Sequence, residues 1–213
     1  RYFLTMAGIG AVLLNVTGRA SHAGGAPEQG RNALYELAHQ VLQMRDLSDA
    51  AAGIKLNWTI ASAGVTRNVI PAEARATADF RVLRVAAYDE VERVVRQRIQ
   101  NQLIPDTMVE VSFERRRPPL EATEASRALA AHAQSVYDEI GYRLLVSDQA
   151  AGGGTDAAFA ALESDAPVIE GFDLVGFGAH SDASVYVDLN SVVPRLYLLA
   201  RMVMDVSQGH APL

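Results

Sequence analysis

The chain has 213 residues, of which 49% are hydrophobic and 21% are charged, as in an ordinary soluble globular protein of one large or two small domains. Its net charge of -6 disfavours a nucleic-acid partner, because a polyanion would be repelled over most of the surface. The chain has no cysteine, which excludes disulfides and thiolate metal sites, and the apolar stretch from Phe3 to Val16 falls short of the roughly 20 residues that span a bilayer. We therefore expect a soluble protein with no membrane partner, and the compartment, cytoplasmic or periplasmic, stays open.

Between about Gly10 and Arg117 the sequence predicts four strands and two helices in the order βαββαβ. The strands are an apolar run and three segments with alternating hydrophobic residues, at about residues 11–16, 56–64, 74–81 and 109–114. Helical spacing of apolar residues predicts helices over about residues 28–47 and 89–103. One face of the first helix carries Leu34, Leu37, Ala38, Val41 and Met44. This order is that of a ferredoxin-like α+β domain, with both helices on one face of an antiparallel sheet.

Pro118 and Pro119 mark a boundary, because proline cannot donate to a strand ladder and biases the preceding residue away from helix. Residues 118–213 then alternate helices with short strands, as in an α/β sheet layered with helices. The predicted helices cover about residues 129–140, the segment after Gly152–Asp156, and residues 191–206, and the strands cover residues 144–146 and 167–169. Two or three short strands are too few for an independent sheet. We therefore expect this unit to complete a larger sheet.

His180 is the first candidate for chemistry, in a loop rich in glycine and alanine. Glycines let the backbone approach a ligand closely, and imidazole is a common zinc ligand. Asp182 follows two residues later, but two donors fall short of the three or four that zinc requires. From these residues alone, a metal ligand and an ordinary loop histidine both stay open.

Three further positions have a functional and a plain structural interpretation. Gly152–Asp156 could bind an anion at a helix start, with Thr155 as a cap, or be a flexible turn. His22 could donate to an oxyanion or cap the turn after the first strand. Arg81 could bind a carboxylate with its guanidinium fork or form a surface ladder with Asp79. The remaining histidines are expected to face solvent: His39, His132 and His210.

The order of five motifs resembles that of one known family. The motifs are Thr17–Gly24, Asn68–Pro71, Ala78–Arg81, Gly152–Asp156 and Gly178–Asp182. Together they resemble the zinc-dependent carboxypeptidase and aminoacylase family, which includes glutamate carboxypeptidases, acetylornithine deacetylase and succinyl-diaminopimelate desuccinylase. Two further segments, Asn57–Ile60 and Gly153–Ala158, also resemble the folate-hydrolysing glutamate carboxypeptidases (carboxypeptidase G).

The resemblance implies a zinc-binding catalytic domain interrupted by a ferredoxin-like lid, or dimerisation, domain. Residues 10–117 correspond to the lid, and residues 118–213 to the C-terminal segment of the α/β catalytic domain. The N-terminal segment, which in the family supplies the other ligands of two Zn²⁺ ions and a glutamate general base, has no counterpart in these 213 residues.

Roles for single residues follow from the same resemblance. His180 would ligate one zinc, although Val185 stands where the family usually has a glutamate shortly after this ligand. His22 would reach across a homodimer to stabilise the tetrahedral oxyanion. Arg81 would bind the terminal carboxylate of the substrate, with Asn68 supplying a nearby polar contact. The backbone at Gly153 and Gly154 would line the same pocket.

These roles predict that the chain is part of a zinc metallopeptidase, which hydrolyses an amide bond and releases a C-terminal amino acid such as glutamate. Its substrate would be a small N-acyl amino acid or peptide, and we expect the 213 residues alone to be inactive. Two alternatives stay open: a non-catalytic dimerisation module, and an aminoacylase or deacylase of the same family.

Overall fold

The computed structural model describes residues 2–178 and 184–213. His180 and Asp182 therefore lie outside the described residues. The chain divides into two compact units, one made of Ala7–Pro119 and the other of Arg1–Met6 together with Leu120–Leu213. Both contain helices and strands, so the chain has mixed α/β content. No helix in the described ranges is long and apolar enough to cross a membrane.

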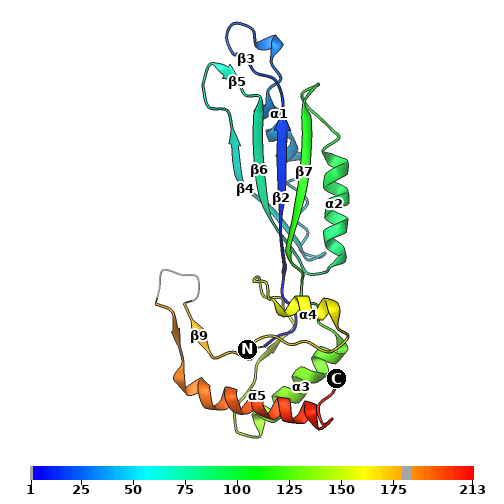
Figure 1. Ribbon diagram of the computed structural model, residues 1–213, viewed down its shortest axis with the longest axis vertical. Coiled ribbons are helices and arrows are strands. Elements are labelled where there is room, and N and C mark those ends of the chain that lie inside the picture. The colour runs from blue at the N-terminus through cyan, green and yellow to red at the C-terminus, as the bar shows by residue number, and fades with distance from the viewer. Residues whose placement is uncertain (1, 179–183) are drawn as a thin grey trace. The chain divides into compact units, whose positions relative to one another are not determined.

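The unit Ala7–Pro119 is built on a four-stranded antiparallel sheet of order β4-β6-β2-β7 (Figure 1). The central strands are β2 (Gly8–Thr17) and β6 (Glu73–Val82), and the edges are β4 (Ile54–Ala63) and β7 (Met108–Arg117). All four predicted strands are present. Each of them begins before its predicted first residue, because backbone pairing with the neighbouring strand does not depend on the side-chain pattern.

Two helices share one hydrophobic core with the sheet: α1 (Ala33–Gln43) and α2 (Ala86–Arg98). The predicted start of α1 at Glu28 was wrong, because a 3₁₀ turn at Pro27–Gln29 comes first and the Asn32 side chain caps the helix. The predicted ends were also late, since α1 stops at Gln43 and α2 at Arg98.

Two very short strands were not predicted. β3 (Ser21–His22) pairs antiparallel with β5 (Val69–Ile70), beyond the ends of the main sheet (Figure 1). We call residues 18–31 and 64–72, which hold this pair, the His22 lobe.

The second unit packs α3 (Glu124–Asp138) against α5 (Val192–Ser207) around a core that includes Tyr2 and Leu198. Shorter elements complete it: β1 (Tyr2–Phe3) parallel to β8 (Val146–Ser147), α4 (Ala157–Glu163), and the antiparallel pair β9 (Gly176–Phe177) and β10 (Tyr186–Val187). The strand predicted at residues 167–169 was wrong, because only the next residue, Glu170, pairs, in a single bridge with Phe3.

Candidate functional site

The His22 lobe brings together two of the predicted site residues, His22 and Asn68. His22 pairs with Val69 in the β3–β5 ladder, and the Ala23 N–H donates to the Asn68 carbonyl oxygen at 2.9 Å. Two motifs that lie far apart in the sequence are therefore neighbours in space.

Hydrogen bonds around the imidazole of His22 define which of its nitrogens can donate. Nδ1 accepts the backbone N–H groups of Gly24 and Gly25, at 3.2 and 3.0 Å. A neutral imidazole carries one proton, so with Nδ1 as acceptor the proton sits on Nε2. His22 is exposed, and its Nε2–H is therefore a donor held by a turn. The two interpretations of His22 are thus compatible, because the ring orders the turn with one nitrogen and can offer the other to a ligand.

Two glycines allow the lobe to form. A Cβ on Gly18 would lie 2.1 Å from the carbonyl oxygen of Arg31, and one on Gly30 would lie 2.5 Å from Ser21 Oγ. Both distances are shorter than any ordinary van der Waals contact, so the chain needs glycine at these positions. Arg19 and Arg31 close the base of the lobe by exchanging backbone hydrogen bonds of 3.0 and 2.9 Å.

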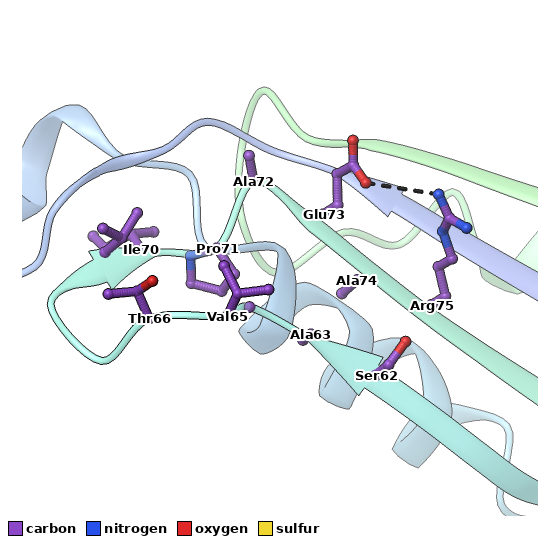
Figure 2. A pocket seen from close by; sticks show the side chains of 12 residues that line it. Ser62, Ala63, Val65, Thr66, Ile70, Pro71, Ala72, Glu73, Ala74 and Arg75 are labelled. Atoms are coloured by element: carbon purple, nitrogen blue, oxygen red, sulfur yellow. Dashed lines mark ion pairs between the residues drawn. The ribbon is translucent and has the colours of Figure 1, made fainter.

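A pocket of about 530 Å³ opens beside the lobe, between the end of β4, β5 and the start of β6 (Figure 2). Its wall is largely apolar, including Val65, Ile70 and Pro71, and Glu73 and Arg75 form an ion pair of 3.6 Å at one side. The pocket could hold a small ligand with an apolar part.

Arg81 lies at the other end of the sheet. It pairs with Ile9 and Lys55, whereas Glu73, at the lobe end of β6, pairs with Thr17. Eight residues separate Glu73 from Arg81 along β6, or about 26 Å at roughly 3.3 Å per residue. In one copy of the chain, Asn68 therefore lies beside His22 and not beside Arg81, contrary to the expected proximity.

The guanidinium of Arg81 binds Asp79 with two nitrogens. Nε lies 2.9 Å from Oδ2 and Nη2 lies 3.0 Å from Oδ1, and both side chains are partly exposed. The pairing of Arg81 with Asp79 at the surface is therefore present in this chain. A substrate carboxylate would have to share or replace Asp79 in this contact.

Gly153 and Gly154 belong to the other unit, in the turn before α4. A Cβ on Gly153 would meet nothing closer than the Met6 side chain at 4.0 Å, and one on Gly152 nothing within 4 Å. Thr155 orders the end of the turn, since its hydroxyl donates to Glu170 Oε2 at 2.7 Å and accepts the Ala157 N–H at 3.1 Å. The turn is open to a ligand, but no described contact assigns one to it.

The described residues do not fit a metal site. Within residues 2–178 and 184–213, no three His, Asp or Glu side chains come together so that they could hold an ion. The predicted ligand His180 lies outside these ranges, and Val185, where the family usually has a glutamate, is 68% exposed.

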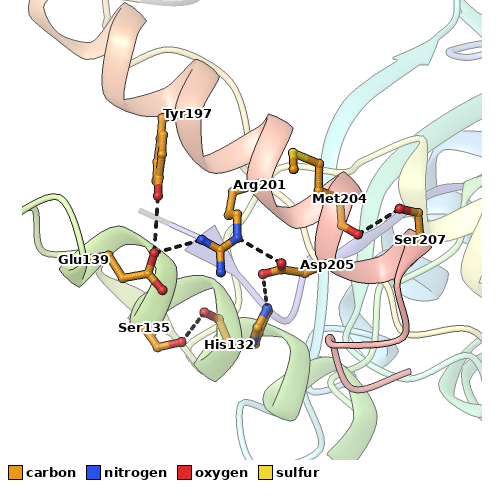
Figure 3. Close-up of polar contacts among 8 residues, drawn as sticks. All are labelled: His132, Ser135, Glu139, Tyr197, Arg201, Met204, Asp205 and Ser207. Carbon is orange, nitrogen blue, oxygen red and sulfur yellow. Dashed lines mark hydrogen bonds and ion pairs between the residues drawn. The ribbon is translucent and has the colours of Figure 1, made fainter.

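A polar cluster that sequence reasoning missed joins α3 to α5 (Figure 3). His132 was expected to face solvent, yet its side chain is only 20% exposed and its Nε2 lies 2.8 Å from Asp205 Oδ2. Arg201 links the same Asp205 to Glu139, which Tyr197 also contacts. The i,i+4 spacing of Arg201 and Asp205 signals one pair of the cluster. No local spacing signals the link to α3, because 73 residues separate His132 from Asp205.

Comparisons with known proteins identify the family. Residues 5–107 match the family model described as a peptidase dimerisation domain. The chain is 44% identical over 206 residues to carboxypeptidase G2 of Pseudomonas sp. (strain RS-16), covering 97% of this chain and 49% of that protein. It is 40% identical over 65 residues to a p-aminobenzoyl-glutamate hydrolase homolog of Haemophilus influenzae, covering 30% of this chain and 15% of that protein.

Among solved structures, aminopeptidase PepT from Bacillus cereus ATCC 10987 shares the fold, with a TM-score of 0.80 at 16% identity over 97% of this chain and 54% of that one. The chain spans about half the length of carboxypeptidase G2 and of this neighbour. Residues 5–107 are therefore a peptidase dimerisation domain of the M20 type, in a chain that is similar along nearly its whole length to about half of carboxypeptidase G2.

Proposed function

We propose that the chain is the lid and the C-terminal catalytic segment of a zinc carboxypeptidase that releases a C-terminal amino acid such as glutamate. The observation that carries this proposal is the 44% identity with carboxypeptidase G2 across 97% of the chain. A second relative is named for hydrolysis of p-aminobenzoyl-glutamate, an N-acyl amino acid. The lid, over residues 10–117, would have ferredoxin-like topology, which the strand order β4-β6-β2-β7 and the shared core of α1 and α2 support.

In this proposal His22 donates its Nε2–H to the oxyanion that forms when the amide carbonyl is attacked. The Nδ1 hydrogen bonds to Gly24 and Gly25 support this role, because they leave the proton on the nitrogen that faces outward from the turn. Arg81 binds the terminal carboxylate of the substrate. The substrate carboxylate either displaces Asp79 from the guanidinium or shares the guanidinium with it. As the family resemblance implies, the backbone at Gly153 and Gly154 would contact the substrate.

His180 would ligate one of two Zn²⁺ ions, which would polarise the carbonyl and supply the attacking hydroxide. The described residues contain no complete ligand set, so the remaining ligands and the general base would come from the half of the relatives that this chain does not cover. We therefore expect the 213 residues by themselves to be inactive.

The separation of His22 from Arg81 supports a site shared between two copies. About 26 Å along one strand is too far for both side chains to touch one small substrate. We infer that His22 and Asn68 of one copy act in the site of the partner copy, whereas Arg81 acts in the site of its own copy. One substrate molecule can then contact Arg81 of one copy and His22 of the other. A homodimer is then required for activity.

Mixing two inactive variants tests this arrangement. The chain would replace the matching half of carboxypeptidase G2, giving a full-length hybrid that is assayed for release of glutamate from p-aminobenzoyl-glutamate. His22→Ala and Arg81→Ala hybrids should each be inactive, and a mixture of the two should regain roughly a quarter of the activity, since half of the dimers then hold one intact site. A mixture that stays inactive, with both hybrids dimeric, would rule out the shared site, and an inactive unmutated hybrid would contradict the proposed enzyme.

Zinc content tests the prediction that these 213 residues lack a complete set of zinc ligands. We expect the purified 213 residues to hold less than one zinc per chain and to release no glutamate above background. Stoichiometric zinc that disappears in His180→Ala would show that the chain holds a full ligand set. Efficient zinc-dependent hydrolysis would contradict the expected inactivity.

A second candidate function is a non-catalytic dimerisation module, which the match of residues 5–107 to a dimerisation domain favours. Sedimentation of the chain as a monomer at high micromolar concentration would exclude it.

A further inference from the structure

One side chain of the His22 lobe ties the lobe to a distant part of the same unit. Arg31 donates from Nε and Nη2 to Asp106 Oδ2, at 3.4 and 3.1 Å, across 75 positions in the sequence. Asp106 lies in the turn before β7, whose first residue, Met108, pairs with Thr17 at the end of β2. Asp106 therefore stands beside the strand end from which the lobe extends. Among the described residues, no other ion pair joins a side chain of the lobe to a residue outside it.

Within the lobe, two arginine side chains hold the backbone that follows the His22 turn. Their guanidinium groups donate to three consecutive carbonyl oxygens, those of residues 28–30. Arg31 Nη1 donates to the first and the third at 3.4 and 2.9 Å, and Arg19 Nε donates to the second at 2.7 Å. Arg31 thus contacts the lobe with Nη1 and the carboxylate outside the lobe with Nη2.

The segment that carries Asp106 is fixed to the core of the unit. The buried carboxylate of Glu36 accepts the N–H groups of Leu103 and Ile104 at 2.8 and 2.7 Å. Thr107 is also buried, and its hydroxyl donates to the Ile104 carbonyl oxygen at 2.8 Å. Residues on both sides of Asp106 are therefore held in place, so its carboxylate is a fixed point to which the lobe is attached.

The backbone of Asp106 adopts a conformation that favours glycine. Its φ is 61°, and within residues 2–178 and 184–213 no other residue except glycine has a positive φ. A residue with a Cβ is less stable in this region than in ordinary helix or strand, although the short side chains of Asp and Asn tolerate it best. Glycine would relieve that strain but would also remove the carboxylate. An aspartate at this position therefore indicates a use for its carboxylate.

Stability alone does not account for this use. The Asp106 side chain is 76% exposed and that of Arg31 is 25% exposed. An exposed ion pair is screened by water and salt, and holding two side chains in one geometry costs conformational entropy. The net contribution of the pair to the free energy of unfolding is therefore small. The contact restricts where the lobe lies more than it stabilises the fold.

We propose that Arg31 and Asp106 are positioning residues, which hold the His22 lobe in one orientation relative to the four-stranded sheet. The inference rests on the proposed function, in which the lobe carries His22 into the site of the partner copy. A hydrogen-bond donor stabilises an oxyanion only if it is already in place when the charge forms. The Arg31–Asp106 pair limits the orientations of the lobe, so His22 Nε2–H is in place for a larger fraction of the time. Neither residue of the pair touches the substrate.

Two substitutions at position 106 separate positioning from folding. Asp106→Gly removes the carboxylate but suits the positive φ, whereas Asp106→Asn tolerates the same φ and keeps an oxygen that can accept from Arg31. Glu90→Ala is the matched control, because it removes an exposed ion pair with Arg84 elsewhere in the unit. All three variants of the 213-residue chain should melt within about 3 °C of the native chain, since exposed ion pairs add little stability.

Amide hydrogen exchange measures the order of the lobe. In Asp106→Gly, the N–H groups of Ala23 and Ala26, both hydrogen-bonded within the lobe, should exchange about tenfold faster or more. In Asp106→Asn and Glu90→Ala they should stay within about threefold of the native rate, and the amides of β2 should keep their rate in every variant. Unchanged exchange of the lobe in Asp106→Gly would overturn the inference. Equal acceleration in β2 would overturn it too, because the whole fold would then be weakened.

Kinetics of the full-length hybrid test whether this order serves catalysis. In the Asp106→Gly hybrid, kcat should fall about tenfold while KM stays within about twofold, because His22 acts on charge that forms in the transition state. Asp106→Asn should recover most of kcat. Faster exchange in the lobe with unchanged kcat would refute the positioning role. An inactive unmutated hybrid would contradict the proposed function alone, since the exchange rates still test whether the Arg31–Asp106 pair holds the lobe.

Discussion

His132 and Asp205 are joined by a hydrogen bond of 2.8 Å from His132 Nε2 to Asp205 Oδ2, which links α3 to α5. The other carboxylate oxygen, Oδ1, accepts from Arg201 Nε at 2.9 Å (Figure 3). Asp205 is only 2% exposed, so these two donors, rather than water, stabilise the negative charge of its carboxylate. The hydrogen bond from Arg201, followed by that from His132, lowers the pKa of Asp205 below its ordinary value of 3.8.

Asp205→Asn should destabilise the second unit at pH 7 and destabilise it less at pH 3. Because the pKa of Asp205 is lower in the folded chain, the folded state binds fewer protons than the unfolded state as the carboxyl titrates. Its stabilisation is therefore fully present above about pH 4 and is lost as the pH falls through the folded pKa. Urea unfolding followed by circular dichroism at both pH values measures the difference. Asp138→Asn, exposed on α3, is the control, and an equal loss for Asp205→Asn at pH 3 and pH 7 would contradict the prediction.

Glu36→Ala should lower the free energy of unfolding of the first unit by about 2 to 4 kcal/mol. The carboxylate of Glu36 is fully buried, and its Oε2 accepts the N–H groups of Leu103 and Ile104 at 2.8 and 2.7 Å. Alanine leaves these donors without their acceptor. Fluorescence of Trp58, the only tryptophan, reports unfolding of this unit. Glu110→Ala, exposed on β7, should change stability by less than about 0.5 kcal/mol; similar losses in the two variants would refute the role of Glu36.

Asn32→Ala should cost about 1 kcal/mol, because the Asn32 side chain caps α1. Its Oδ1 accepts the N–H groups of Leu34 and Tyr35 at 3.0 and 3.3 Å. Asn32→Asp keeps an acceptor at the same place and should retain most of the stability. Trp58 fluorescence during urea unfolding measures both variants, and equal stability of Asn32→Ala and the native chain would show that the cap contributes nothing.

Gly18→Ala should disturb the His22 lobe and cost about 1 to 3 kcal/mol. The added methyl group would lie 2.1 Å from the carbonyl oxygen of Arg31, a backbone atom that cannot move without shifting the base of the lobe. Amide hydrogen exchange of Ala23, whose N–H binds Asn68, should become faster. Gly24→Ala is the matched control, since its methyl group would meet His22 only at 3.9 Å. Unchanged exchange at Ala23 in Gly18→Ala would contradict the close approach.

The longer elements were predictable because their side chains repeat with the period of the structure. Alternation predicted residues 74–81 for β6, which covers Glu73–Val82, and the last helix, predicted at residues 191–206, is α5, which covers Val192–Ser207. The two-residue strands β3 and β5 are too short to show any period, and their pairing joins positions such as Ser21 and Ile70 that are remote in sequence.

The apolar face of α1 was predicted as one continuous face, but the structure divides it. Leu37 and Met44 are buried in the core, whereas Leu34 and Ala38 remain exposed. Periodicity counts apolar residues around a helix and cannot tell which of them face the sheet of the same chain.

The sequence by itself determined the four long strands and the longer helices and, through the order of five motifs, the family resemblance and the residues worth testing. Only the tertiary structure decided that His22 and Asn68 are neighbours and that Arg81 lies at the far end of the same sheet. The reason is physical: side-chain patterning is set by each segment and its solvent-facing side, whereas the distance between two motifs depends on which strands pair and in which register.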